Sequence, residues 1–229
     1  MRPHRLALLA AVLATTALPG CDLPPNLGSD SQTPLDQATA AIDIVGSADS
    51  GQAEVTARIT GRLGGTVELT DTRAVFVNDQ RLSGPNGAGE YVATIAGASS
   101  YVIRASEPSR GVEETTVTAP APFDITAPTA HGALSLSGAT LTWSLADPTL
   151  DVAVELQQTL FGVLHRADFG PFPDAGSLPL SAQNLKDFRQ GADLIVTVTR
   201  SQGRAGLAGF QSATVTMAVS RTVIATPAP

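Results

Sequence analysis

Cysteine is almost absent from this chain, which has Cys21 as the only cysteine among its 229 residues. A single cysteine excludes an intrachain disulfide and any zinc site built on several thiolates. Histidine is nearly as scarce, with only His4, His131 and His165. We therefore expect no metal and no cofactor, so that stability must come from the burial of apolar side chains.

Basic residues are few as well. The chain has 14 Lys and Arg against 21 Asp and Glu, and Lys186 is the only lysine. Loss of Arg2 and Arg5 with the first 20 residues would change the formal net charge from −7 to −9. Nucleic-acid binding needs clustered Lys and Arg. This composition therefore predicts that nucleic acid is not a partner.

No apolar run is long enough for a membrane-spanning helix. The apolar run at the start of the chain, Leu6 to Leu18, carries no charge and has 13 residues, whereas a spanning helix needs about 20. A short segment with two arginines, 1–5, precedes it. This order of a basic start and a short apolar run is typical of a secretory signal peptide.

Leu18, Gly20 and Cys21 end the apolar run in a pattern that resembles the lipobox of bacterial lipoproteins. The resemblance implies cleavage between Gly20 and Cys21 and attachment of lipid to the Cys21 thiol. It also implies a bacterial cell-envelope location, with the membrane bound through the N-terminal lipid. One acyl chain binds a membrane only marginally, whereas two or more hold a protein firmly.

The composition predicts an all-β fold. Aromatic residues are 4% and charged residues 15% of the chain, while Thr, Ser, Ala, Val and Gly dominate, as in sheets with many turns. We expect a signal peptide at 1–20 and a flexible tether at 21–40, which is rich in Pro, Ser and Asp. A first block then spans 41–122 and a second block spans 123–229.

Alternating apolar and polar residues define the first block, beginning with a strand at 53–60. Asn78 to Gln80 is predicted to form a tight turn and 83–89 a loop. Prolines at 119–128 favour extended backbone without donors and mark the junction between the blocks.

The second block repeats the alternation. Trp143, the only tryptophan, lies in an alternating run and is predicted to be buried. Phe161, Val163, His165, Ala167 and Phe169 are predicted to share one face of a strand. Residues 180–188 are the only stretch that resembles a helix, with Ser181 as its cap. Residues 213–219 show the clearest alternation in the chain.

Strand number, strand spacing and Trp143 together make the chain resemble two tandem antiparallel β-sandwich domains of the immunoglobulin-like or fibronectin type III-like kind. The resemblance concerns the fold alone, because such sandwiches carry many unrelated functions. One continuous sandwich with a crossover strand is the alternative for the same pattern.

No pattern of catalytic residues is present. The chain has no Gly-x-Ser-x-Gly segment, and neither His131 nor His165 has a recognisable nucleophile partner in sequence. The aspartates are scattered rather than spaced for calcium. We therefore expect no catalytic residues and a protein that is not an enzyme.

The leading hypothesis is a lipid-anchored, non-enzymatic structural or protein-interaction module with a partner in the envelope. Sheet edges and the loops at 83–89, 107–111 and 170–177 are the expected contacts. A glycan-binding module is the alternative, because Phe161, Phe169 and Phe172 form the only local concentration of rings. An unrecognised hydrolase is the third hypothesis.

Overall fold

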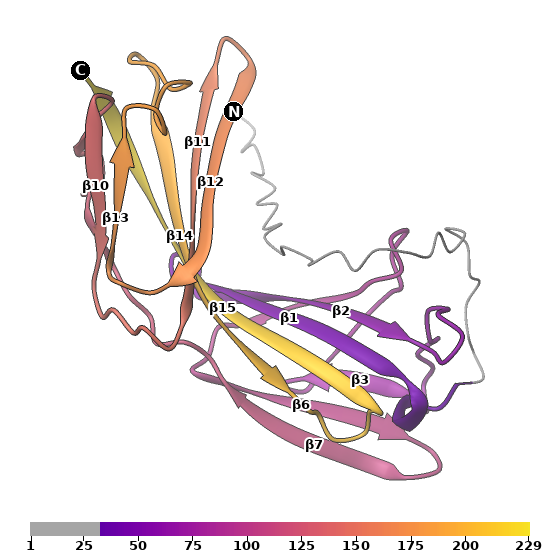
Figure 1. Ribbon diagram of the computed structural model, residues 1–229. Helices are drawn as coiled ribbons and strands as arrows, with labels where there is room; N and C mark the ends of the chain where they lie inside the picture. Colours follow the sequence, from indigo (N-terminus) through magenta and orange to yellow (C-terminus); the bar gives the residue numbers. More distant parts are fainter. Residues whose placement is uncertain (1–32) are drawn as a thin grey trace.

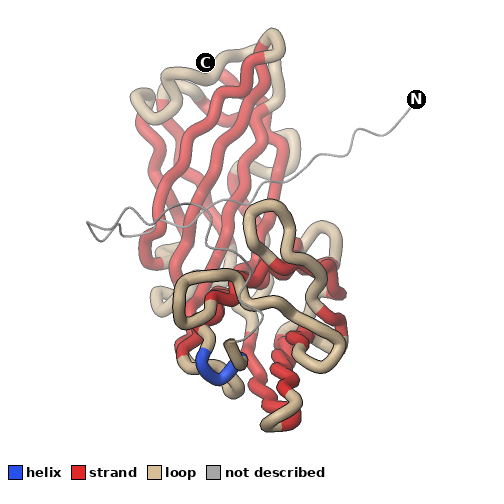
Figure 2. Tube along the Cα trace, turned by 90° about the vertical axis from the view of Figure 1, so that its right-hand side faces the viewer, coloured by secondary structure: helices blue, strands red, loops and turns tan. Residues whose placement is uncertain are grey.

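The computed structural model describes residues 33–229, and within this range the protein is all-β (Figure 1). The single helical element in the range is the 3-10 turn η1, Leu35–Gln37, drawn in blue in Figure 2. The predicted all-β class is confirmed. Residues 33–229 contain no helix with the length and hydropathy needed to cross a membrane.

The strands run in chain order through two halves of the molecule. Their bounds are β1 Thr39–Ser47, β2 Gln52–Thr60, β3 Ala74–Val77, β4 Gln80–Arg81, β5 Tyr91–Ala96, β6 Ser100–Glu107, β7 Gly111–Thr118, β8 Ile125–Ala127, β9 Ala133–Ser135, β10 Gly138–Trp143, β11 Asp151–Leu160, β12 Val163–Pro173, β13 Ser177–Ser181, β14 Leu194–Ala205 and β15 Ser212–Ala228.

One large sheet passes through both halves. Its strand order is β12-β11-β14-β15-β1-β2-β5, with β9 attached to β15. The long strand β15 pairs in parallel with β1 along 212–220 and antiparallel with β14 along 214–225. Two smaller sheets, β13-β10-β8 and β4-β3-β6-β7, complete the structure. The fold is therefore sandwich-like, with a sheet shared between its halves.

Two hydrophobic clusters fill the space between the sheets. The first joins β1, β2 and β5 to the sheet of β3, β6 and β7, and it includes Ala213, Val215 and Met217 of β15. The second joins β11, β12 and β14 to the sheet of β10 and β13, and it includes Ala225 of β15. Side chains of β15 thus belong to both clusters, which lie in the lower and upper parts of Figure 1.

The last residues of the predicted tether at 21–40 are part of the fold. Within the described residues, Leu35, Ala38 and Ala40 are fully buried in the first cluster, and β1 begins at Thr39. Burial of these apolar side chains outweighs the preference of the neighbouring polar residues for solvent. The predicted signal peptide 1–20, its cleavage site and Cys21 lie outside the described residues. Blocks 41–122 and 123–229 stay predictions as separate domains.

The sequence-based predictions of burial and turns are confirmed where apolar and polar residues alternate strictly or a turn is marked by Asn and Asp. Ala53, Val55, Ala57 and Ile59 of β2 point into the first cluster. Asn78 and Asp79 both have positive φ, +46° and +65°, as the predicted tight turn requires. Trp143 is 4% exposed and lies in the second cluster, as predicted.

The predicted helix at 180–188 is wrong, because this segment forms the end of β13 and a series of turns. Ser181 does bond as a cap would, since its Oγ accepts a hydrogen bond from the Asn184 N–H. The Asn184 side chain in turn accepts from the Ser181 N–H, which gives the reciprocal bonds of a capping box. The backbone then continues through turn bonds between residues three apart, such as Leu185 N–H to the Ala182 carbonyl. Leu185 and Phe188 are nevertheless both buried, so the apolar pair was recognised and its backbone was not.

Candidate interaction site

The residues considered for chemistry are not brought together by the fold. His131 lies beside β15, where its backbone N–H donates to the Ile224 carbonyl, whereas His165 is half-buried on β12. Residues 33–229 contain no group of three or more His, Cys, Asp or Glu side chains placed to hold a metal ion. Cys21 and Gly20, the predicted lipidation and cleavage residues, fall outside the range that the structure describes.

A buried ion pair lies beside the second cluster. Arg200 on β14 and Asp174 are both fully buried, with 2.7 Å between Arg200 Nη2 and Asp174 Oδ2. The Trp143 indole N–H donates to Asp174 Oδ1 over 2.6 Å. The backbone N–H groups of Asp147 and Gly176 donate to the same carboxylate. Together these partners fix the Asp174 side chain at one position.

The Arg200 side chain connects this carboxylate to the segment between β7 and β8 and to the residue that follows β10. Its guanidinium donates to the carbonyls of Ala121 and Ser144 and lies 4.5 Å from the centre of the Phe123 ring. Arg200 Nε has no hydrogen-bond partner and is buried. No solvent or concave surface reaches the group, because both charged side chains are completely covered. Its geometry is that of a structural tie and not of a reaction site.

Three exposed apolar residues of the second half gather at the tip of the β11–β12 hairpin, whereas Leu145, which is 66% exposed, lies apart from them after β10. Phe161 is 105% exposed, and Val163 and Leu164 are each 58% exposed. Leu160 pairs with Val163, so Phe161 and Gly162 form a two-residue turn. Figure 1 shows this tip projecting at the upper end of the molecule. We call residues 160–164 the hairpin tip.

Folding alone does not account for phenylalanine at this turn. Phe161 has φ +49° and Gly162 has φ +80°, a pattern for which hairpins prefer Asn-Gly or Asp-Gly. Phenylalanine in the left-handed region costs about 1 kcal/mol, and its ring here gains no burial in return. A residue that is unfavourable both in backbone and in exposure points to a contact outside the chain.

β12 is also an edge strand. It pairs with β11 on one side, and no strand within residues 33–229 pairs with its other side. The solvent face of the hairpin carries Glu155, Arg166 and Asp168, which form ion pairs of 2.6 Å for Arg166–Glu155 and 2.9 Å for Arg166–Asp168. Open strand edges are places where another chain can add a strand.

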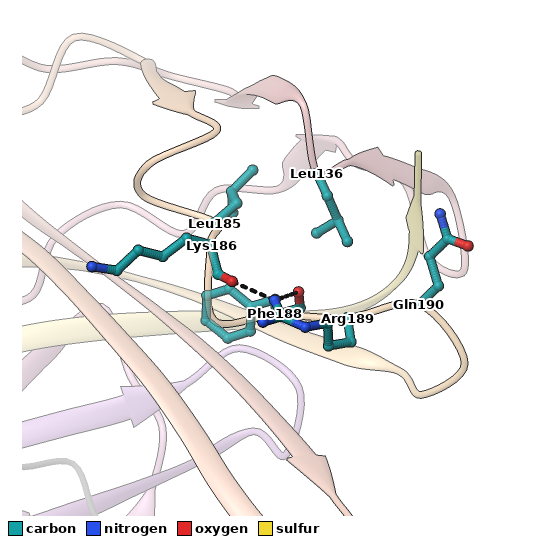
Figure 3. Close-up of a pocket in the computed structure, with 6 residues that line it drawn as sticks. All are labelled: Leu136, Leu185, Lys186, Phe188, Arg189 and Gln190. Carbon is teal, nitrogen blue, oxygen red and sulfur yellow. Dashed lines mark hydrogen bonds between the residues drawn. The ribbon is translucent and has the colours of Figure 1, made fainter.

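A shallow hollow of about 530 Å³ lies near the same end of the molecule (Figure 3). Leu185 and Phe188, in its wall, are buried residues of the second cluster. The Arg189 guanidinium donates to the carbonyls of Lys186 and Phe188, which are part of the same wall. Leu136 and Gln190 complete the lining. The lining contains no carboxylate or imidazole, and its ionisable side chains are those of Lys186 and Arg189.

The expected contact loops differ in what they expose. Loop 83–89 is held by the Asn86 side chain, which accepts from the N–H groups of Ala88 and Glu90. In turn 107–111 the Glu107 side chain is buried and paired with Arg73. Segment 170–177 buries Asp174. None of these three presents an apolar side chain comparable with Phe161.

The three rings considered for glycan binding are not one platform. Phe169 and Phe172 are half-buried and pack against the second cluster, whereas Phe161 stands alone at the tip. The expectation that Phe161 shares a strand face with Val163 and Phe169 is wrong, because Phe161 lies in the turn. The signal that was missed is Gly162, which separates two alternating runs at the spacing of a two-residue hairpin.

No model of a known protein family matches the chain, and none of the curated protein sequences is similar to it. The site must therefore be interpreted from its own geometry, in which the hairpin tip and the β12 edge are two features that the folding of this chain leaves without a partner among residues 33–229.

Proposed function

We propose that this protein is a lipid-anchored component of a bacterial cell envelope that acts, without catalysis, as a protein-interaction module. In this proposal two tandem immunoglobulin-like β-sandwich domains follow a signal peptide. The two hydrophobic clusters support the sandwiches, and the order Leu18, Gly20, Cys21 supports the anchor.

The observation that carries the interaction role is the hairpin tip. A phenylalanine ring that becomes buried in a complex removes roughly 150–250 Å² from water. At about 25 cal/mol per Å² this is a gross gain of several kcal/mol. Two further apolar side chains, Val163 and Leu164, flank the ring. Rigid hairpins with an aromatic residue at the tip lose little conformational entropy on binding, so the tip suits insertion into an apolar pocket of a protein partner.

A photoreactive amino acid at position 161 tests the contact in intact cells. We expect a discrete protein adduct from position 161 and none from position 63, because Leu63 is also exposed (82%) but lies in the other half of the molecule. Phe161→Asn should abolish partner binding while keeping the fold, since Asn suits positive φ. Lipid adducts alone, loss of the adduct on adding free glycan, or equal labelling from position 63 would contradict a protein partner.

The anchor is tested separately by Cys21→Ser and membrane fractionation. We expect the wild-type chain in the membrane fraction and the Cys21→Ser chain outside it, because the thiol is the only attachment point for the diacylglyceryl group. Metabolic labelling with a fatty acid should mark the wild-type protein alone. Unchanged partition of the serine variant would remove the anchor from the proposal.

A further inference from the structure

The free side of β12 has a defined set of hydrogen-bonding groups. In a two-residue hairpin the flanking pair, here Leu160 and Val163, is a hydrogen-bonded pair, and such pairs alternate along the strands. Residues 163, 165, 167 and 169 therefore point their backbone groups toward β11. The backbone N–H and C=O groups of Leu164, Arg166 and Asp168 point the other way, toward the open edge.

The ends of this edge are also defined. Pro171 and Pro173 lie at the lower end of β12, where the pairing with β11 shifts between Val152 and Val154. Proline has no N–H to donate, so a ladder along the edge cannot continue past residue 170. The hairpin turn ends the edge at the other side. The stretch that can accept an added strand is 164–170.

The charges on this stretch are complementary to themselves. Arg166 and Asp168 are two residues apart and lie on the same face of β12. Suppose that a second copy of β12 pairs antiparallel with the first. Hydrogen bonds then form only where Leu164, Arg166 or Asp168 of one copy lies opposite a residue of the other copy whose backbone groups also point to the open edge, namely 164, 166, 168 or 170. Only three registers meet this condition near the centre of the stretch.

One of the three registers is favoured. Arg166 opposite Arg166 and Asp168 opposite Asp168 both place like charges in direct cross-strand contact, which is destabilising. The remaining register places Arg166 of each copy opposite Asp168 of the other, with Ala167 facing Ala167 at the two-fold axis. It forms two Arg166–Asp168 pairs, each hydrogen-bonded and of opposite charge, and it places Leu164 of each copy opposite residue 170 of the other.

We infer that β12 is a homodimer interface, in which two copies of this chain join their large sheets edge to edge in the Arg166–Asp168 register. The occupant of the edge is thus a second copy and not a different protein. This inference goes beyond the proposed function, because it rests on the β12 edge and does not require a partner at the hairpin tip or a lipid on Cys21.

Charge reversal tests the register with the full chain carrying Cys21→Ser, by sedimentation over a concentration series. Arg166→Asp alone and Asp168→Arg alone should each raise the dimer dissociation constant about tenfold or more, because both symmetric pairs become repulsive. The double reversal Arg166→Asp with Asp168→Arg restores opposite charges across the axis and should restore the dimer. Trp143 fluorescence confirms that each variant remains folded.

Cysteine cross-linking tests the same register independently. In the Cys21→Ser background, Ala167→Cys places two thiols in a non-hydrogen-bonded pair with Cα atoms about 4.5 Å apart, within the range that a disulfide spans. His165→Cys, on the same face, would leave its Cα atoms about 13 Å apart. We expect a disulfide-linked dimer from position 167 and not from 165.

A chain that stays monomeric at the highest concentration reached would overturn the inference, whether the edge is free or covered by another segment. A dimer that is indifferent to the three charge variants, or equal cross-linking at 165 and 167, would overturn it as well. Because these measurements use the purified chain alone, their failure leaves the cross-linking result at position 161 unaffected.

Discussion

Removal of the Asp174 carboxylate is expected to destabilise the protein more than any change on its surface. Asp174→Ala leaves the Arg200 guanidinium charged, since arginine does not lose its proton in proteins, and fully buried without its counter-charge. Breaking a buried pair in this way costs roughly 3–5 kcal/mol. The Trp143 indole N–H also loses its acceptor, which adds about 1–3 kcal/mol where water cannot enter.

The free energy of unfolding should therefore fall by about 4 kcal/mol or more, a large part of the 5–15 kcal/mol typical of a folded protein. Asp174→Asn keeps an acceptor for the indole and should cost less than Asp174→Ala. The double variant Asp174→Leu with Arg200→Met removes both charges, and it should be more stable than Asp174→Ala alone because no buried charge is left unpaired. The matched surface control is Asp71→Ala, which breaks the exposed Arg81–Asp71 pair and should cost no more than about 1 kcal/mol.

Urea unfolding measures these differences. Trp143 is the only tryptophan and contacts Asp174 directly, so its fluorescence reports on the second cluster, while far-UV circular dichroism reports on all strands. The change in free energy follows from the shift in midpoint at constant slope. An Asp174→Ala protein within about 1 kcal/mol of wild type would refute the view that the ion pair is a structural tie beside the second cluster.

Two further outcomes follow from buried polar groups. Burial raises the pKa of the Asp43 carboxyl above its ordinary 3.8, so its ionised form opposes folding. Asp43→Asn should be more stable than wild type at pH 7, and the difference in unfolding free energy should vanish as the pH falls through the raised pKa to below 3.8; an equal difference at all pH values would contradict this. The buried Gln158 amide bonds the Arg189 and Ala192 carbonyls and the Arg189 N–H. Gln158→Leu should cost about 2–4 kcal/mol and increase amide exchange around residue 189, and unchanged exchange there would show that the turns at 182–193 are held by their apolar residues instead.

Strand content and burial were predictable because they depend on local alternation. Ala53, Val55 and Ile59 repeat with the period of a pleated sheet, so their side chains lie on one face of the strand, and that face packs in the first cluster. Trp143 was likewise assigned correctly, since a large ring in an alternating run has no better place than the core. For such residues the local strand pattern and the packing of the whole fold favour the same buried position.

The candidate site was not predictable from the same rules, because it consists of exceptions to them. Phe161 has the hydropathy of a core residue, and the alternation rule assigned it to a strand face. Its position at the tip depends on Gly162 and on the long-range pairing of β11 with β12. The Arg200–Asp174 pair joins residues far apart in sequence, and Asp174 in a proline-rich loop resembles any solvated turn aspartate. Pairings of this kind are decided by tertiary packing, which single-sequence patterns do not contain.

The contribution of β15 to both hydrophobic clusters affects the order in which the parts of the molecule can fold. Ala213, Val215 and Met217 form part of the first cluster, yet in sequence they follow every strand from β8 to β14. During synthesis or export, residues 35–119 emerge early and must wait for this last strand before β1 gains its parallel neighbour. A nascent chain that stalls before residue 212 therefore exposes an unfinished apolar face, which makes it a substrate for chaperones and proteases until the end of the chain arrives.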